Sequence, residues 1–100
     1  MSYRAVQAVI KASREPGRFD NAEFRVLVNL AEHLNDRTGQ CNPGLKLLGA
    51  ETCLGRGHLL RAINRLEDRG ELFRPGSSKG GRGHRQQYQI LLKGTWEGPF

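Results

Sequence analysis

The stretch LGRGHLLRAINRLEDRG, residues 54–70, constrains the fold of this chain more than any other. Its apolar side chains recur at helical spacing and would share one face of a helix: Leu59, Ala62, Ile63 and Leu66. Gly70 suits the end of such a helix, because glycine enters the left-handed conformation without steric cost. Arginines and a histidine occupy much of the remaining surface, so the stretch predicts an amphipathic helix with one buried and one basic face.

Two helices are predicted closer to the N-terminal end. Residues 3–14 are expected to form a short helix, with Val6, Val9 and Ile10 at helical spacing, that stops at the turn-forming residues 16–17. Residues 22–36 carry the clearest helical pattern, and Asp20 or Asn21 is expected to cap it. The apolar stripe of this second helix consists of Phe24, Leu27, Val28, Ala31 and Leu34.

A third, shorter helix is predicted between these elements and the basic stretch. Asn42 is expected to cap it and Pro43 to be its first residue, because proline loses nothing where the backbone amide is unpaired. The helix would cover residues 43–51 and bury Leu48 together with Leu45 or Leu47. Residues 52–55 are too few for anything but a turn.

The C-terminal part of the chain predicts a β-hairpin. Residues 71–74 and 86–92 have strand character, and the glycine-rich, basic segment PGSSKGGRGHR, residues 75–85, joins them. Residues 93–100 show no periodicity and are expected to be an irregular tail. We therefore predict one α+β domain over residues 1–100, with a core in 20–92 and an additional N-terminal helix.

The charge of the chain is strongly uneven. Lys and Arg number 16 against 10 Asp and Glu, which gives a net charge of +6, and residues 56–100 carry five of these six charges. Such a field attracts polyanions, of which nucleic acid is the commonest for a domain of this kind. Net positive charge that serves only solubility is the plainer alternative.

The order helix, short helix, turn, basic helix and hairpin is the layout of a winged helix-turn-helix. Residues 20–92 also resemble the winged helix-turn-helix domains of phage and plasmid replication initiators and related mobile-element regulators. The resemblance rests on CNPG at 41–44, LGRGHL at 54–59, RAINRLEDRG at 61–70 and the Gly/Arg-rich segment that follows. Where that family has hydroxyl side chains at the caps and at a phosphate contact, this chain has Gly44, Gly55 and His58, and Gly57 lies in the first turn of the basic helix.

The resemblance implies binding of double-stranded DNA, with the basic helix in the major groove and the hairpin as a wing on phosphates or in the minor groove. The function implied is transcriptional regulation or replication control in a phage or mobile element. A homodimer would read half-sites about 10 bp apart or a multiple of that spacing. The residues expected to contact DNA are Arg56, His58, Arg61, Asn64 and Arg65 of the helix, and Lys79, Arg82, His84 and Arg85 of the wing.

Two other interpretations of the basic helix remain open. Its arginines could form a solvated face, with Glu67 or Asp68 as ion-pair partners. The same scaffold could instead bind an acidic protein or a ribonucleoprotein, as small phage inhibitors of the anti-CRISPR kind and excisionase-like adaptors do. The missing cap serine, an exposed Leu60, and Trp96 and Phe100 in the tail favour this second alternative. RNA is a weaker option, because no aromatic stacking pattern is present.

The sequence argues against metal binding and catalysis. The candidate ligands His33, His58, His84, Cys41 and Cys53 lack the paired spacing of a zinc site, so no cofactor is expected. The carboxylates Glu23, Glu32, Asp36 and Glu51 are scattered, and no nucleophile-base pair supports an enzyme. Two cysteines, an early apolar run interrupted by Arg4 and Lys11, and the lack of a membrane-length apolar run predict a soluble, reduced, cytoplasmic protein.

Overall fold

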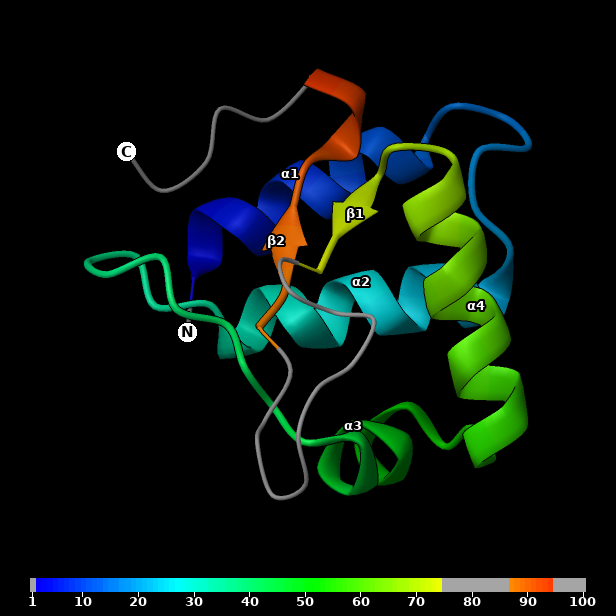
Figure 1. The fold of residues 1–100 in the computed structure, drawn as a ribbon. Coiled ribbons are helices and arrows are strands. Elements are labelled where there is room, and N and C mark those ends of the chain that lie inside the picture. Colours follow the sequence, from blue (N-terminus) through cyan, green and yellow to red (C-terminus); the bar gives the residue numbers. More distant parts are fainter. Residues whose placement is uncertain (1, 75–86, 95–100) are drawn as a thin grey trace.

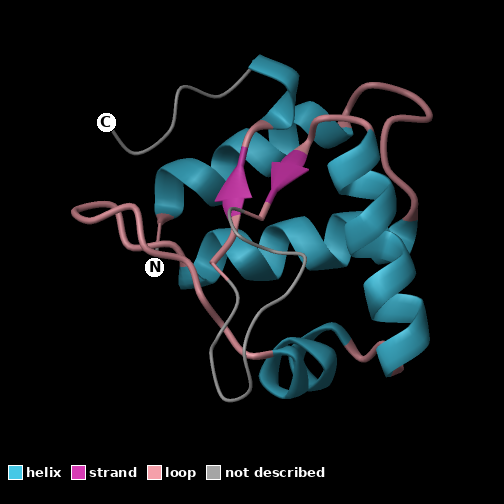
Figure 2. Cartoon of the chain, in the orientation of Figure 1, coloured by secondary structure: helices cyan, strands magenta, loops and turns pink. Residues whose placement is uncertain are grey.

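The computed structural model describes residues 2–74 and 87–94, and these confirm the predicted α+β class. Within them the chain forms α1 (Tyr3–Ser13), α2 (Asn21–His33), α3 (Leu45–Thr52), α4 (Arg56–Asp68), β1 (Leu72–Phe73), β2 (Gln89–Ile90) and a 3₁₀ turn at Leu92–Gly94. Helix α2 runs through the middle of the molecule, and the other three helices and the antiparallel strand pair surround it (Figure 1, Figure 2). The predicted connection at 75–85 and the tail from residue 95 lie outside the described residues.

Helix α4 forms as its pattern predicts. All four residues of its apolar stripe are buried, with at most 1% of their surface exposed: Leu59, Ala62, Ile63 and Leu66. The helix closes through Arg69, and Gly70 follows with a φ of +76°, in the left-handed region. The prediction of glycine at this end is confirmed, because a side chain there would be strained.

Helix α2 begins at a capping box. The Asp20 side chain accepts a hydrogen bond from the Glu23 amide at 2.8 Å, and the Glu23 side chain accepts one from the Asp20 amide at 3.0 Å. Of the two predicted caps, Asp20 is therefore the one used. The helix ends at His33 rather than at residue 36, because Leu34 turns into the core and the Asn35 carboxamide accepts from the amides of Arg37 and Thr38.

The buried face of α2 differs from the predicted stripe. Phe24 and Val28 are only partly buried, whereas Val26 and Leu30 are fully buried together with Leu27. The physical reason is that α2 has neighbours on several sides, with α1 on one and α3 and α4 on others (Figure 1). In α1 the buried positions are likewise Ala5, Val9 and Ala12, and Val6 and Ile10 are only partly covered.

Helix α3 starts two residues later than predicted, at Leu45, with Gly44 rather than Asn42 as its N-cap. The preceding segment stays extended because it is fastened to the hairpin: the Tyr88 amide donates to the Cys41 carbonyl at 2.8 Å. The buried Cys41 thiol also donates to the Leu30 carbonyl at 3.2 Å. Leu48 is buried as predicted, and of the two alternatives Leu45 packs against the core while Leu47 stays half exposed.

The two strands are shorter than predicted, with Leu72 opposite Ile90 and Phe73 opposite Gln89. Beyond them, the Glu71 carbonyl accepts from the amides of both Leu91 and Leu92, and the chain turns there instead of continuing as a strand. Leu72, Tyr88, Ile90 and Leu92 nevertheless join the same core as the helices. The strand pair thus packs against the helices.

Candidate nucleic-acid interface

The exposed surface of α4 divides into an outer face and two edges. Gly57, Arg61, Asn64 and Asp68 lie opposite the buried stripe, at the helical spacing that keeps them on one face. Arg56 lies on the edge toward α3, where it lines a hollow with Lys46 and Ala50. The structure therefore does not gather the predicted contact residues on a single strip of helix.

His58 lies on the opposite edge of α4, toward α2. It lines a hollow with Asn21 and Arg25 beside the first turn of α2. His58, Arg56 and Arg61 are all exposed, and none of them forms a hydrogen bond or ion pair with another described residue. These three side chains are thus available to a partner.

Gly57 and Arg61 are neighbours on the outer face. The Arg61 Nη1 atom lies 3.4 Å from the point that a Cβ at residue 57 would occupy. A larger side chain at this position would contact the guanidinium, and glycine leaves that space open. The cost is a lower helix propensity, by up to about 1 kcal/mol relative to alanine.

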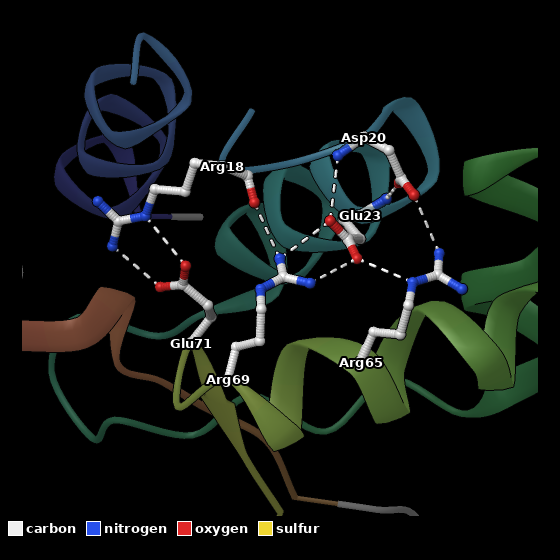
Figure 3. Close-up of polar contacts among 6 residues, drawn as sticks. All are labelled: Arg18, Asp20, Glu23, Arg65, Arg69 and Glu71. Carbon is white, nitrogen blue, oxygen red and sulfur yellow. Dashed lines mark hydrogen bonds and ion pairs between the residues drawn. The ribbon is translucent and has the colours of Figure 1, made fainter. Parts of the chain in front are cut away.

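Arg65, which was predicted to face DNA, is engaged within the protein. Its Nε donates to Glu23 Oε2 at 2.9 Å, and its Nη2 donates to Asp20 Oδ2 at 3.1 Å (Figure 3). The side chain keeps 41% of its surface exposed. The expectation that Glu67 or Asp68 would pair with arginines of this helix is therefore wrong for Arg65. Its partners are Glu23 in α2 and Asp20 at the N-cap of α2.

Glu23 is the centre of this cluster. Only 3% of its surface is exposed, and Arg69 also binds it, through Nη1 to Oε2 at 2.9 Å and Nη2 to Oε1 at 3.0 Å. Burial alone would raise the pKa of the Glu23 carboxyl, but hydrogen bonds from Arg69, Arg65 and the Asp20 amide, with the charge of Arg69, lower that pKa from 4.5 to about 2. The carboxylate stays charged and fixes the C-terminal half of α4 against the start of α2.

A second ion pair extends the cluster toward the hairpin. Arg18 donates through Nε and Nη2 to the two oxygens of the fully buried Glu71 carboxylate, at 3.0 and 2.9 Å (Figure 3). Arg69 Nη2 also donates to the Arg18 carbonyl at 2.9 Å. The turn before α2, the end of α4 and the start of β1 are thereby tied together.

Asn64, the predicted adenine contact, has its side-chain oxygen in use. Its Oδ1 accepts from Arg74 Nη2 at 2.9 Å, and Arg74 also pairs with Glu67 at 2.6 Å. The hydrogen bond from Arg74 lowers the pKa of Glu67. Bidentate recognition of adenine needs both the oxygen and the nitrogen of the carboxamide, so in this conformation Asn64 offers only its NH₂ group.

Helices α3 and α4 both begin at glycine. Gly44 occupies the N-cap of α3 in place of the predicted Asn42, and Gly55 occupies the N-cap of α4, as the resemblance implied. Neither helix has a side-chain cap hydrogen bond. Ser2 and Asp20, by contrast, cap α1 and α2. The first amides of α4 therefore have no capping side chain.

Sequence reasoning missed the residues that hold α4 and α3 in place. Glu23 was considered only as a catalytic candidate, although its spacing from Asp20 is the signature of a capping box. Arg25 Nη1 donates to the Thr52 carbonyl at 3.1 Å, and His33 pairs with Glu51 at 2.6 Å, so both link α2 to the end of α3. These long-range pairs leave no pattern in a single sequence.

The predicted role of four basic side chains in a wing stays a prediction, because they lie outside the described residues: Lys79, Arg82, His84 and Arg85. Leu60 is half-buried rather than exposed.

In the part of the chain that the structure describes, no three His, Cys, Asp or Glu side chains lie together as a metal site. No helix in that part is long and apolar enough to cross a membrane.

Comparison with known proteins returned no relative. No family model matches the chain, and no significant match exists among curated proteins or solved structures.

Proposed function

We propose that this chain is a winged helix-turn-helix protein that binds double-stranded DNA through α4 and the basic segment 75–85. The observation that carries the proposal is the state of the first two turns of α4. There Arg56, His58 and Arg61 are exposed and unpaired among the described residues, and the helix starts without a capping side chain. Basic side chains beside helix amides that lack a capping side chain favour the binding of phosphate.

The position of the hairpin supports a joint surface. Arg74, the last described residue before the basic segment, donates to Asn64 on the outer face of α4. The described chain therefore reaches Arg74 next to the helix that is proposed to enter the major groove. Helix and wing can then contact neighbouring parts of one duplex, which is how such a motif combines base reading with phosphate contacts.

The ion pairs divide the arginines of α4 into two roles. Arg61 is proposed to contact a base edge or phosphate, with Arg56 and His58 on phosphates at either side. Arg65 is proposed mainly to orient the helix, since Glu23 and Asp20 already hold its guanidinium. The wing residues Lys79, Arg82, His84 and Arg85 would add phosphate or minor-groove contacts, and Asn64 a single donor. Control of transcription or replication in a phage or mobile element is the biological role that fits such a module.

Fluorescence anisotropy with a labelled mixed-sequence duplex at about 50 and 200 mM salt tests the proposal, because the dependence of affinity on salt counts the phosphates neutralised. We expect a steep fall of affinity with salt, and a slope reduced by about one in Arg82→Ala or Arg85→Ala. Arg61→Ala should weaken binding several-fold. Arg37→Ala removes an exposed arginine from the loop after α2, away from α4, and is the matched control (Figure 1).

The alternative partner, an acidic protein or ribonucleoprotein, is decided by the same experiment. Absence of duplex binding at the lower salt concentration would contradict the proposal. So would equal losses in Arg61→Ala and Arg37→Ala, because the interaction would then depend on net charge and not on α4.

A further inference from the structure

A hollow lies between α3 and α4, and the first residues of both helices line it. Its apolar surface is formed by Leu45, Gly49, Ala50, Leu54 and Leu59. Leu59 is a core residue with 1% of its surface exposed, whereas Leu45 and Leu54 pack against the core and are only partly buried. The volume of the hollow, about 520 Å³, lies in the range of small-molecule sites.

Two small residues keep this apolar surface open. Gly49 has no side chain, and a Cβ there would lie 3.4 Å from the Leu54 carbonyl oxygen and 3.8 Å from Leu59 Cδ2. A methyl group at this position would therefore fill space beside the leucines. Ala50, the next residue, is exposed and contributes only a methyl group. A ligand can thus reach the leucine side chains from solvent.

Every charged side chain that lines the hollow is basic. Lys46 is the second residue of α3 and Arg56 is the first residue of α4. Both are exposed, and neither forms a hydrogen bond or ion pair with another described residue. The one carboxylate of α3, Glu51, is paired with His33 of α2 at 2.6 Å. An apolar surface with two cations at its rim favours an apolar ligand that carries a negative charge.

The surroundings of the hollow favour a small molecule over a protein surface. Gly55 and Gly57 flank Arg56 and offer no side chains, and all three residues are exposed. Leu47 of α3 is half exposed but does not line the hollow. A protein interface of ordinary size buries about 800 Å² on each partner around an apolar centre, which this basic rim does not provide.

We propose that the hollow between α3 and α4 binds a small amphipathic organic anion, a molecule with an apolar chain or ring and one carboxylate. The apolar part covers Leu45, Leu54 and Leu59, and the carboxylate pairs with Lys46 and Arg56. The site itself does not depend on DNA binding.

Octanoate is a suitable probe, because at pH 7 it combines an apolar chain with one negative charge. In two-dimensional NMR spectra of the full chain we expect saturable shifts of the amide signals of residues 45–50 and 54–59, with the signals of α1 unchanged. 1-Octanol lacks the charge and acetate lacks the chain, so each should bind several-fold more weakly at the same ionic strength. Equal binding of octanol, shifts centred on α1, or no saturable shift would overturn the proposal.

Substitution of the two cations tests the polar part of the site. Lys46→Gln and Arg56→Gln should each weaken octanoate binding several-fold, because each removes one positive charge from the rim. Lys11→Gln and Arg37→Gln make the same changes at exposed positions outside the hollow and should leave octanoate affinity unchanged. Equal losses in the rim variants and their controls would overturn the assignment, because binding would then follow net charge alone.

Ala50 tests the location of the site without disturbing the core, because it is exposed on α3. Ala50→Glu adds a carboxylate at the hollow and should weaken octanoate binding more than Ala50→Gln, which has nearly the same size and no charge. Circular dichroism checks that both variants keep their helices. Octanoate affinities equal in both variants and in the unchanged chain would overturn the assignment to this hollow.

Occupation of the hollow has a consequence that rests on the proposed function. Arg56 is among the residues proposed to contact DNA, so a bound carboxylate would compete with phosphate for its guanidinium. Saturating octanoate should weaken duplex binding several-fold relative to acetate at the same concentration, and Ala50→Glu should reduce this effect. Duplex affinity unchanged by saturating octanoate would overturn the competition. Octanoate binding is measured without DNA, so its failure overturns the site, whereas a lack of duplex binding in acetate contradicts the proposed function.

Discussion

Glu23 joins the start of α2 to the end of α4 through one buried carboxylate and two arginines. Glu23→Gln removes the charge while keeping the shape. It leaves Arg65 and Arg69 with a weaker acceptor, so we expect the free energy of unfolding to fall by about 2–3 kcal/mol. This loss is smaller than that for a fully buried ion pair, because both arginines are partly exposed. Urea denaturation at pH 7 measures this change. Glu32→Gln, an exposed carboxylate on the same helix, is the control and should change stability by less than about 0.5 kcal/mol.

The same carboxylate predicts how stability depends on pH. The pKa of Glu23 is lower in the folded chain, about 2, than the 4.5 of a free side chain. The contribution of the Glu23 carboxylate to folding stability is therefore fully present above pH 4.5 and is lost as the pH falls toward 2. The difference between the unfolded and folded pKa values corresponds to about 3 kcal/mol. Denaturation curves between pH 6 and 2 should show a smaller loss in Glu23→Gln than in the unchanged protein. Identical pH profiles would show that Glu23 is not the group responsible.

The two thiols should differ sharply in reactivity. Burial raises the pKa of the Cys41 thiol to about 12, and its Sγ donates to the Leu30 carbonyl, whereas Cys53 is exposed after α3. Because the thiolate is the reactive form, a thiol reagent should modify only Cys53 in the native protein and both residues in denaturant. The Cys53→Ser variant should then show no rapid reaction. Rapid modification of two thiols under native conditions would contradict the described core.

At the scale of the elements, α4 offers a matched pair of adjacent leucines. Leu59 has 1% of its surface exposed and contacts the core, while Leu60 is half-buried at the edge of the helix. Leu59→Ala should destabilise the fold by about 2–5 kcal/mol, and Leu60→Ala by clearly less, because only the first leaves a cavity. Thermal or urea unfolding of the two variants checks this order. Equal losses would mean that α4 is rotated relative to its described orientation.

Periodicity was a sufficient guide where one face of a helix meets the core. It identified every buried residue of α4 and the glycine that ends it. For α2 it was right in part: Leu27, Ala31 and Leu34 are buried as predicted. It missed Val26 and Leu30, because this helix is covered on several sides and a single stripe does not describe it. It also placed the start of α3 too early, since the bond between Tyr88 and Cys41 that keeps residues before Gly44 extended joins segments far apart in the sequence.

At the scale of the whole molecule, the candidate site was predictable in part. The sequence showed that the positive charge is concentrated in residues 56–100, and the structure leaves Arg56, His58 and Arg61 exposed on α4. The sequence did not reveal that carboxylates from α2 and the preceding turn engage Arg65, or that Arg74 engages Asn64. Such pairs depend on how the elements pack against one another, which spacing along one chain does not encode.

Two-dimensional NMR of the ¹⁵N-labelled chain, titrated with a short duplex at low salt, tests the proposed DNA interface most directly. We expect the amide signals of residues 55–61 and of the basic segment 75–85 to shift first, while the signals of α1 stay unchanged. Shifts confined to α1, or no shift at any duplex concentration, would contradict DNA binding through α4.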